Sequence, residues 1–179
     1  MSIAENLTKI AENQQKVFDA WKKAECDEFW DKFQKNGTQS AYVYAFAGYG
    51  WTNEHLEKIK YPLKPLGGDA VNYNGMFYYN INITKTPVLY FGKCGTANSM
   101  FYSCSKLEEV YFEGEIGLSL SFAQSPLLTH DCLTRIITGL KDFSGTTTTR
   151  TLTLHTDSKA KLSDAEKAIA TDKKGWTLA

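Results

Sequence analysis

The first 36 residues carry apolar positions at helical spacing and contain neither proline nor glycine. Ser2 and Glu5 form a capping box, in which each side chain accepts a hydrogen bond from a backbone amide at the start of a helix. The pair Asn36-Gly37 is a typical stop signal. The pattern predicts one helix of about 34 residues, roughly 50 Å long at about 1.5 Å per residue.

The apolar stripe of this predicted helix changes face partway along the chain. Its first part alternates by four and three, as a heptad repeat does, and its second part is a separate aromatic face. One interpretation is that the first part self-associates or binds a partner while the second part packs on the chain's own body. The alternative is one amphipathic helix that lies wholly on its own domain, and the pattern leaves both open. The first part consists of Ile3, Leu7, Ile10, Gln14, Val17, Trp21 and Ala24, and the second of Cys26, Phe29, Trp30 and Phe33.

A repeat begins where the predicted helix ends. The word Met-Phe-Tyr occurs at residues 76–78 and again at 100–102, and each copy is followed by an apolar-Tyr-Phe segment that predicts a strand, around Leu89 and Val110. The segment SFAQSPLL, residues 121–128, echoes MFYSCSKL, residues 100–107, so that Phe122 corresponds to Phe101. Leu152 lies 42 residues after Val110, twice the 21 residues that separate Leu89 from Val110, and predicts a further strand.

Helical segments alternate with these strands in the last third of the chain. Residues 128–140 carry an apolar stripe at helical spacing, and Ser163 with Glu166 forms a second capping box before a stop at Gly175. Repeats of about 20–29 residues that each contribute one strand are typical of leucine-rich-repeat proteins, whose units bury their apolar faces only against their neighbours. The alternative is that the paired words are chance in a chain rich in Tyr and Phe, with an ordinary α+β fold.

The segment FYSCSKLEEVYFEGEIG resembles the unit of BspA-like leucine-rich repeats. The whole layout is similar to short leucine-rich-repeat proteins encoded by phages and prophages of gut Gram-positive bacteria, in the helix AENQQKVFDAWKKAECDEFWDKFQKNG, in YAFAGYGWT and in the tail from LTLHTDSKAKLS to GWTLA. The resemblance covers most of the chain, with residues 52–75 the least typical. It implies a structural or host-recognition role in a phage tail or baseplate.

The combined prediction is an α+β fold in two domains. Residues 1–37 form the long helix, for attachment or oligomerisation. Residues 38–179 form a short, irregular leucine-rich-repeat solenoid with a parallel strand ladder, outer helices and capping ends.

Composition narrows the classes of partner. Twenty basic and twenty acidic side chains cancel, so non-specific binding to nucleic acid or to an anionic membrane has no electrostatic support. Phe, Tyr and Trp together number 24, and such rings are common in protein interfaces. No stretch approaches the roughly 20 apolar residues of a membrane span, and the N-terminus lacks the features of a signal peptide.

Catalytic and metal-binding patterns are weak in this sequence. The four cysteines form no Cys-x-x-Cys pair, which favours buried free thiols over a metal site. In His130-Asp131-Cys132 a nucleophile and a base are chain neighbours, whereas catalytic partners must meet in space with a third group that orients the base. Gly67-Gly68 lacks the lysine and hydroxyl of a phosphate-binding loop. We therefore expect a protein that is not an enzyme and that uses no metal or cofactor.

The outward side of the predicted ladder is the candidate binding surface. At a spacing of 21 residues, Tyr90, Tyr111 and Thr153 form one row, with Glu109 and Glu113 in the flanking rows. The alternative is that these are ordinary exposed strand residues with high strand propensity.

The predicted function is a non-enzymatic virion component, a tail or baseplate protein for structure or host recognition. It binds itself or other virion proteins through the helix, and a host-surface protein or glycan through the repeat surface. Without a signal peptide it is made in the host cytoplasm and resides in the virion. The alternative is a bacterial protein-binding module with no virion role, located in the cytoplasm.

Overall fold

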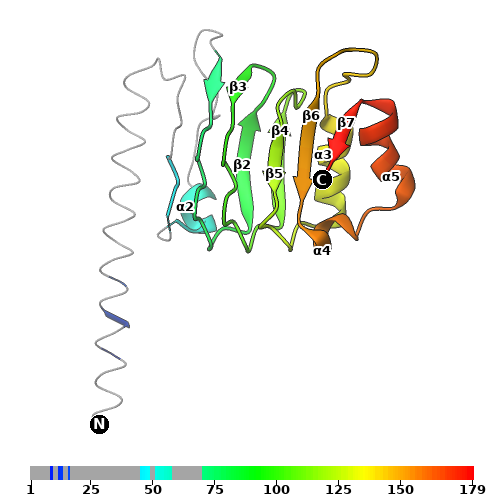
Figure 1. Ribbon diagram of the computed structural model, residues 1–179. Helices are drawn as coiled ribbons and strands as arrows, with labels where there is room; N and C mark the ends of the chain where they lie inside the picture. The colour runs from blue at the N-terminus through cyan, green and yellow to red at the C-terminus, as the bar shows by residue number, and fades with distance from the viewer. Residues whose placement is uncertain (1–8, 10–11, 14–15, 17–44, 49–50, 58–69) are drawn as a thin grey trace. The chain divides into compact units, whose positions relative to one another are not determined.

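A computed structural model describes residues 9, 12–13, 16, 45–48, 51–57 and 70–179 (Figure 1). The chain divides into two compact units, Met1–Gly37 and Thr38–Ala179. In the first unit the described residues are Lys9, Glu12, Asn13 and Lys16, all of them helical. The predicted oligomerisation stripe, Ile3, Leu7, Ile10, Val17 and Trp21, lies outside the described residues, so its role stays a prediction. The second unit carries every strand that the structure describes.

Short elements make up the described part of the second unit. The α-helices are α2 (Asn53–Glu57), α3 (His130–Gly139), α4 (Thr156–Lys159) and α5 (Asp164–Ala168), and the π-helix η1 (Ile169–Lys173) continues α5. The strands are β1 (Val71–Asn72), β2 (Lys85–Tyr90), β3 (Cys94–Thr96), β4 (Glu109–Glu113), β5 (Leu120–Phe122), β6 (Arg150–Leu154) and β7 (Trp176–Leu178).

The described strands pair in parallel in three small sheets. β1 pairs with β3, β2 pairs with β4, and β5, β6 and β7 form the third sheet in that order. Within these sheets Leu89 lies opposite Phe112, and Leu120 lies opposite Leu152. Each pair joins one repeat of the chain to a later one. We call one such repeat, a strand with its connecting segments, a turn, and successive turns of this unit lie against one another.

A column of phenylalanine rings runs through the interior of these turns. Phe46 stacks on Phe77 with ring centroids 5.6 Å apart, Phe77 on Phe101 at 5.9 Å, and Phe101 on Phe122 at 4.7 Å. All four side chains are buried. The backbones of these turns are joined as well, since the amide of Phe77 donates a hydrogen bond to the carbonyl of Met100. The correspondence of Phe77, Phe101 and Phe122 that the repeated words predict is confirmed.

Buried polar side chains satisfy the carbonyl groups beside this column. Each donates a hydrogen bond to a carbonyl of an earlier turn, at 2.8–3.2 Å. A buried carbonyl without a partner costs about 1–3 kcal/mol, so these contacts hold adjacent turns in register. The donors are Asn80 to Phe46, Cys104 to Phe77, Ser125 to Cys104 and Ser158 to Ser125.

Helix α3 packs its apolar stripe against β4. The side chain of Thr129 caps the helix by accepting from the amide of Cys132 at 3.1 Å. Cys132 Sγ in turn accepts from the amide of Val110 in β4, at 3.2 Å. The stripe predicted for residues 128–140 is confirmed, because its members Leu128, Cys132, Leu133, Ile136, Ile137 and Leu140 are all buried.

The predicted fold class is wrong. The structure is a mixed α/β arrangement of small parallel sheets and short helices, not an α+β leucine-rich-repeat solenoid with one continuous ladder. The amide of Thr129, the N-cap residue of α3, donates to the carbonyl of Glu108, which directly precedes β4. Helix α3 therefore lies beside β4, at the position where a continuous ladder would need the next strand. The sheet of β2 and β4 therefore ends there, and Leu152 belongs to a different sheet from Leu89 and Val110.

The long helix predicted for residues 1–37 lies outside the described residues except at the four helical positions named above. Among the helices whose bounds the structure gives, α3, with 10 residues, is the longest. Within the described ranges, no helix combines the length and apolar character needed to cross a membrane.

Candidate functional site

The outward strand residues do not form the predicted rows. Tyr111 lies opposite Val88 in the sheet of β2 and β4, and Tyr90 lies opposite Glu113. Thr153 lies in the other sheet, opposite Ser121. The row of Tyr90, Tyr111 and Thr153 is therefore a wrong prediction.

The spacing of the turns explains the error. The prediction used 21 residues from Leu89 to Val110, whereas the structure pairs Leu89 with Phe112, 23 residues later. Side chains alternate between the two faces of a strand, so a shift of two residues keeps each one on its predicted face but moves it along the strand. Tyr111 accordingly stays exposed, at 38% of its surface.

Tyr111 and Glu109 meet α3 through one arginine. The Arg135 guanidinium lies 5.2 Å from the centroid of the Tyr111 ring, and it forms an ion pair with Glu109. The Glu109 carboxylate also accepts from the hydroxyl of Thr129 at 2.5 Å and raises the pKa of Arg135 through its hydrogen bond. These contacts hold the start of α3 on β4. A binding role for Tyr90, Tyr111, Thr153, Glu109 and Glu113 remains a prediction.

Three tyrosines outside the strands, which the sequence patterns did not predict as a site, form a cluster. The rings of Tyr78 and Tyr102 are nearly parallel, with centroids 5.0 Å apart and planes at 13°. Tyr79 meets Tyr78 at 4.8 Å and Tyr102 at 5.5 Å, edge-on to both. Tyr79 and Tyr102 are exposed, at 37% and 41% of their surface. We call Tyr78, Tyr79 and Tyr102 the tyrosine cluster.

The repeat itself positions the tyrosine cluster. Tyr78 and Tyr102 follow the stacked Phe77 and Phe101 in the chain, so the turn-to-turn step that stacks the buried rings also stacks the outer ones. Tyr79 has a positive φ of 57°, and its amide donates to the carbonyl of Tyr102 at 2.8 Å. A left-handed tyrosine is uncommon and costs about 1–2 kcal/mol, which the surrounding packing must offset.

A second pair of left-handed residues flanks Tyr102. The first pair is Gly75 and Tyr79, which both have positive φ values. One turn of the chain later, Ser99 has a φ of 52° and Ser103 a φ of 60°. Strained non-glycine backbone of this kind concentrates at functional sites. Such strain persists only where the surrounding structure stabilises it, so the packing around Tyr102 must offset the cost at Ser99 and Ser103.

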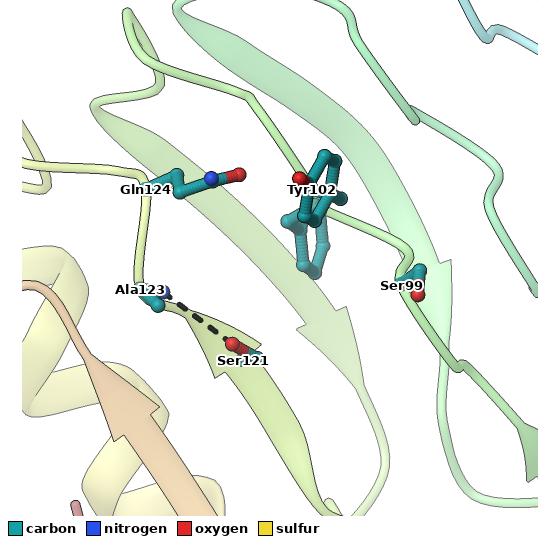
Figure 2. A pocket seen from close by; sticks show the side chains of 6 residues that line it. Ser99, Tyr102, Ser121, Ala123 and Gln124 are labelled. Carbon is teal, nitrogen blue, oxygen red and sulfur yellow. Dashed lines mark hydrogen bonds between the residues drawn. The ribbon is translucent and has the colours of Figure 1, made fainter.

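A groove of about 220 Å³ adjoins Tyr102 (Figure 2). Its lining comes from two successive turns and contains no carboxylate, imidazole, ammonium or guanidinium group. The lining residues are Ser99, Phe101 and Tyr102 from one turn and Ser121, Ala123 and Gln124 from the next.

Gln124 spans the two walls of the groove. Figure 2 shows its side chain reaching from the β5 side toward the segment of Tyr102. Its Oε1 accepts from the Ser103 amide at 2.7 Å and from the Ser103 hydroxyl at 3.2 Å. These two contacts fix the orientation of the amide group. The Nε2 group donates no hydrogen bond to the described part of the chain.

Of the three described cysteines, Cys104 and Cys132 are buried free thiols and Cys94 is a half-buried one. Burial raises the pKa of Cys132 to about 11, and that of Cys104 to about 12. Both stay protonated at neutral pH, so neither supplies the thiolate that a nucleophile needs. The Nε2 atom of His130 lies 2.9 Å from the Glu166 carboxylate. In the part of the chain that the structure describes, no group of three or more His, Cys, Asp or Glu side chains could hold a metal ion.

The signal for the groove was present in the alignment of SFAQSPLL with MFYSCSKL. That alignment matches Phe122 with Phe101, and so it matches Ala123 with Tyr102. A stack of tyrosines therefore has to end where the third turn supplies an alanine. The change from Tyr to Ala within the repeat is the signal in the sequence that indicates the groove.

Comparison with known proteins adds no relative to these observations. No family model matches the chain, and no curated protein and no solved structure matches it either. The resemblance to BspA-like proteins of phages and prophages stays a prediction from the sequence.

Proposed function

We propose that this chain is a non-enzymatic recognition protein that binds its ligand at the tyrosine cluster and the adjoining groove. The observation that carries the proposal is the contact of three tyrosine rings, at centroid distances of 4.8–5.5 Å, on an exposed part of the surface. Tyrosine is favoured in binding surfaces because its ring supplies a large, rigid contact area and its hydroxyl forms hydrogen bonds, with little loss of conformational entropy.

The chemistry of the groove supports binding over catalysis. Its polar groups are hydroxyls and one carboxamide, and its lining contains no carboxylate, imidazole, ammonium or guanidinium group. General acid–base catalysis needs a positioned group whose pKa lies near the working pH. The lining supplies shape and hydrogen bonds, which are what recognition requires.

A virion is the setting that we propose for this recognition role. The support is the resemblance of the sequence to short phage and prophage proteins, for which host recognition is an expected role. Mass spectrometry of purified particles tests the setting: peptides of this chain must copurify with tail or baseplate proteins. If they are found only in the lysate, the virion role is wrong, whereas the binding role is untouched and the alternative of a bacterial binding module applies.

The test of the binding role measures how alanine substitutions of exposed residues change the binding of the chain to cells. The full chain, carrying a fluorescent label, is mixed with a panel of intact Gram-positive cells, and bound fluorescence is measured by flow cytometry. We expect Tyr102→Ala to weaken binding about tenfold, the loss that corresponds to about 1.4 kcal/mol. Leu127→Ala, at another exposed apolar residue, serves as the control that leaves binding unchanged.

Tyr111→Ala decides between the tyrosine cluster and the surface predicted from the sequence. Tyr111 is 38% exposed, close to the 41% of Tyr102, but it lies on β4 against Arg135. The proposal requires binding to survive this substitution. Loss of binding in Tyr111→Ala with retention in Tyr102→Ala would move the site to the strand surface. A wild-type chain that binds no cell in the panel would contradict the recognition role.

A further inference from the structure

We infer that the groove beside Tyr102 binds one uncharged sugar unit of a glycan, which stacks on Tyr102 as the third ring of the Tyr78–Tyr102 stack. This inference rests on the proposed recognition function and names the class of ligand. It follows from three features of the groove: the residue that is missing from the stack, the charge of the lining, and the space available.

The groove occupies the position of a missing ring. The inner rings form a continuous column through Phe101 and Phe122, whose centroids are 4.7 Å apart. The outer column begins with Tyr78 and Tyr102, but the residue after Phe122 is Ala123, which lines the groove. Tyr78, from the preceding turn, stacks on the Tyr102 ring, and the groove is lined by Tyr102 and by Ser121, Ala123 and Gln124 from the following turn. A flat ring in the groove therefore continues the outer column.

The lining selects an uncharged, hydroxyl-rich ring. No cation is present among the lining residues to bind a phosphate or carboxylate, and no anion to bind an amine. The hydroxyls of Ser99 and Ser121 can each donate and accept, and the Gln124 Nε2 group is a donor held in place from its other end. A sugar offers the matching combination, with hydroxyls around its rim and weakly positive C–H groups on a face that suits the negative face of an aromatic ring.

The dimensions of the groove argue against an inserted peptide strand. A strand placed between two turns needs about 4.8 Å on each side. The rings of Phe101 and Phe122 lie 4.7 Å apart, so the two turns are already in contact beneath the groove. The volume of about 220 Å³ is also below the roughly 300–1,000 Å³ of sites for drug-sized ligands. One sugar unit fits this space, and the rest of a glycan extends into solvent.

The test fills the groove with the ring that the sequence omits. Ala123→Tyr places a tyrosine where the ligand would stack, and Ala165→Tyr, at an exposed position of α5, is the matched control. The full chain and both variants are applied to an array of neutral glycans, acidic glycans and peptides. We expect the wild type and Ala165→Tyr to bind neutral glycans, and Ala123→Tyr to lose that binding while its circular dichroism spectrum stays native.

Three outcomes would overturn the inference. The first is binding of neutral glycans that Ala123→Tyr retains in a folded protein, because the ligand would then lie elsewhere. The second is binding of acidic glycans or peptides alone. The third comes from the labelled chain on intact cells: binding that survives periodate, which cleaves vicinal diols of sugars, but is lost after protease treatment assigns the ligand to a protein. In that third case the recognition function stands and only the sugar inference fails, whereas a chain that binds neither arrays nor cells contradicts both.

Discussion

The column of buried phenylalanines makes a strong prediction about stability. Phe101 is an inner ring of the column, in contact with Phe77 on one side and Phe122 on the other, and 1% of its surface is exposed. Replacing it with alanine removes the ring and both ring contacts, and leaves a cavity between successive turns. The adjacent Tyr102 is the matched position, because it lies one residue later and forms the outer column, yet 41% of its surface is exposed.

The expected magnitudes differ severalfold. Phe→Ala substitutions in well-packed cores cost about 3–5 kcal/mol of the free energy of unfolding. Tyr102→Ala loses ring contacts worth roughly 0.5–1.5 kcal/mol but leaves no enclosed cavity, so we expect a cost of about 1 kcal/mol. A domain of this size loses roughly 2–4 °C of melting temperature per kcal/mol, so Phe101→Ala should lower it by about 6–20 °C.

Urea unfolding followed by circular dichroism measures both variants. The Phe101→Ala midpoint should fall well below that of Tyr102→Ala, with an unchanged slope against urea concentration. A double-mutant cycle between Phe77→Leu and Phe101→Leu should give a coupling energy of about 0.5–1.5 kcal/mol. Equal costs for Phe101→Ala and Tyr102→Ala would show that the phenylalanine column is not the core of this unit, and the stacking of turns would have to be abandoned.

Three further predictions concern a turn, a thiol and a helix cap. Gly114 and Gly145 both have positive φ, but only at Gly114 would a Cβ lie 2.6 Å from the Gly92 nitrogen. In urea unfolding Gly114→Ala should therefore lower the free energy of unfolding by more than the roughly 1–2 kcal/mol expected for Gly145→Ala, and equal costs would contradict this. Because burial raises the pKa of Cys132 to about 11, its alkylation at pH 8, mapped by mass spectrometry, should be far slower in the native chain than in urea; equal rates would refute its burial. Hydrogen bonds from Ser163 lower the pKa of Glu166 from 4.5 to about 2, so the carboxylate's contribution to stability is complete above about pH 4.5 and is lost as the pH falls through about 2. Glu166→Gln should weaken the pH dependence of the urea midpoint between these pH values, and an unchanged dependence would contradict the shift.

Patterns in the sequence predict the structure correctly where neighbouring residues decide the outcome. The apolar stripe of α3 is buried as its spacing predicts, because a helix places residues three and four apart on one face. The second capping box is present in the structure, with the Ser163 side chain accepting from the Glu166 amide and the Glu166 side chain accepting from the Ser163 amide. Both features depend on residues within one or two helical turns of each other.

Pairings between distant segments are predicted only in part. The repeated words identified which phenylalanines correspond, but they did not fix the register of the strands, which differs from the predicted one by two residues. The lengths of the connecting segments vary from turn to turn, and a count along the chain cannot show where each connection absorbs the difference. The sequence count likewise did not show that α3 lies beside β4 or that the strands divide among three sheets.

The candidate site illustrates the same division. The sequence alone determined that an aromatic pair recurs and that its second ring is absent from the third copy, because these facts are a matter of residue identity. The tertiary structure decided that Tyr78 and Tyr102 stack, that Tyr79 joins them, and that the alanine leaves a groove with Gln124 across it. The physical reason is that stacking depends on a few ångströms of separation between turns, and that separation is set by the packing of Phe101 on Phe122 and by hydrogen bonds between residues more than 20 positions apart.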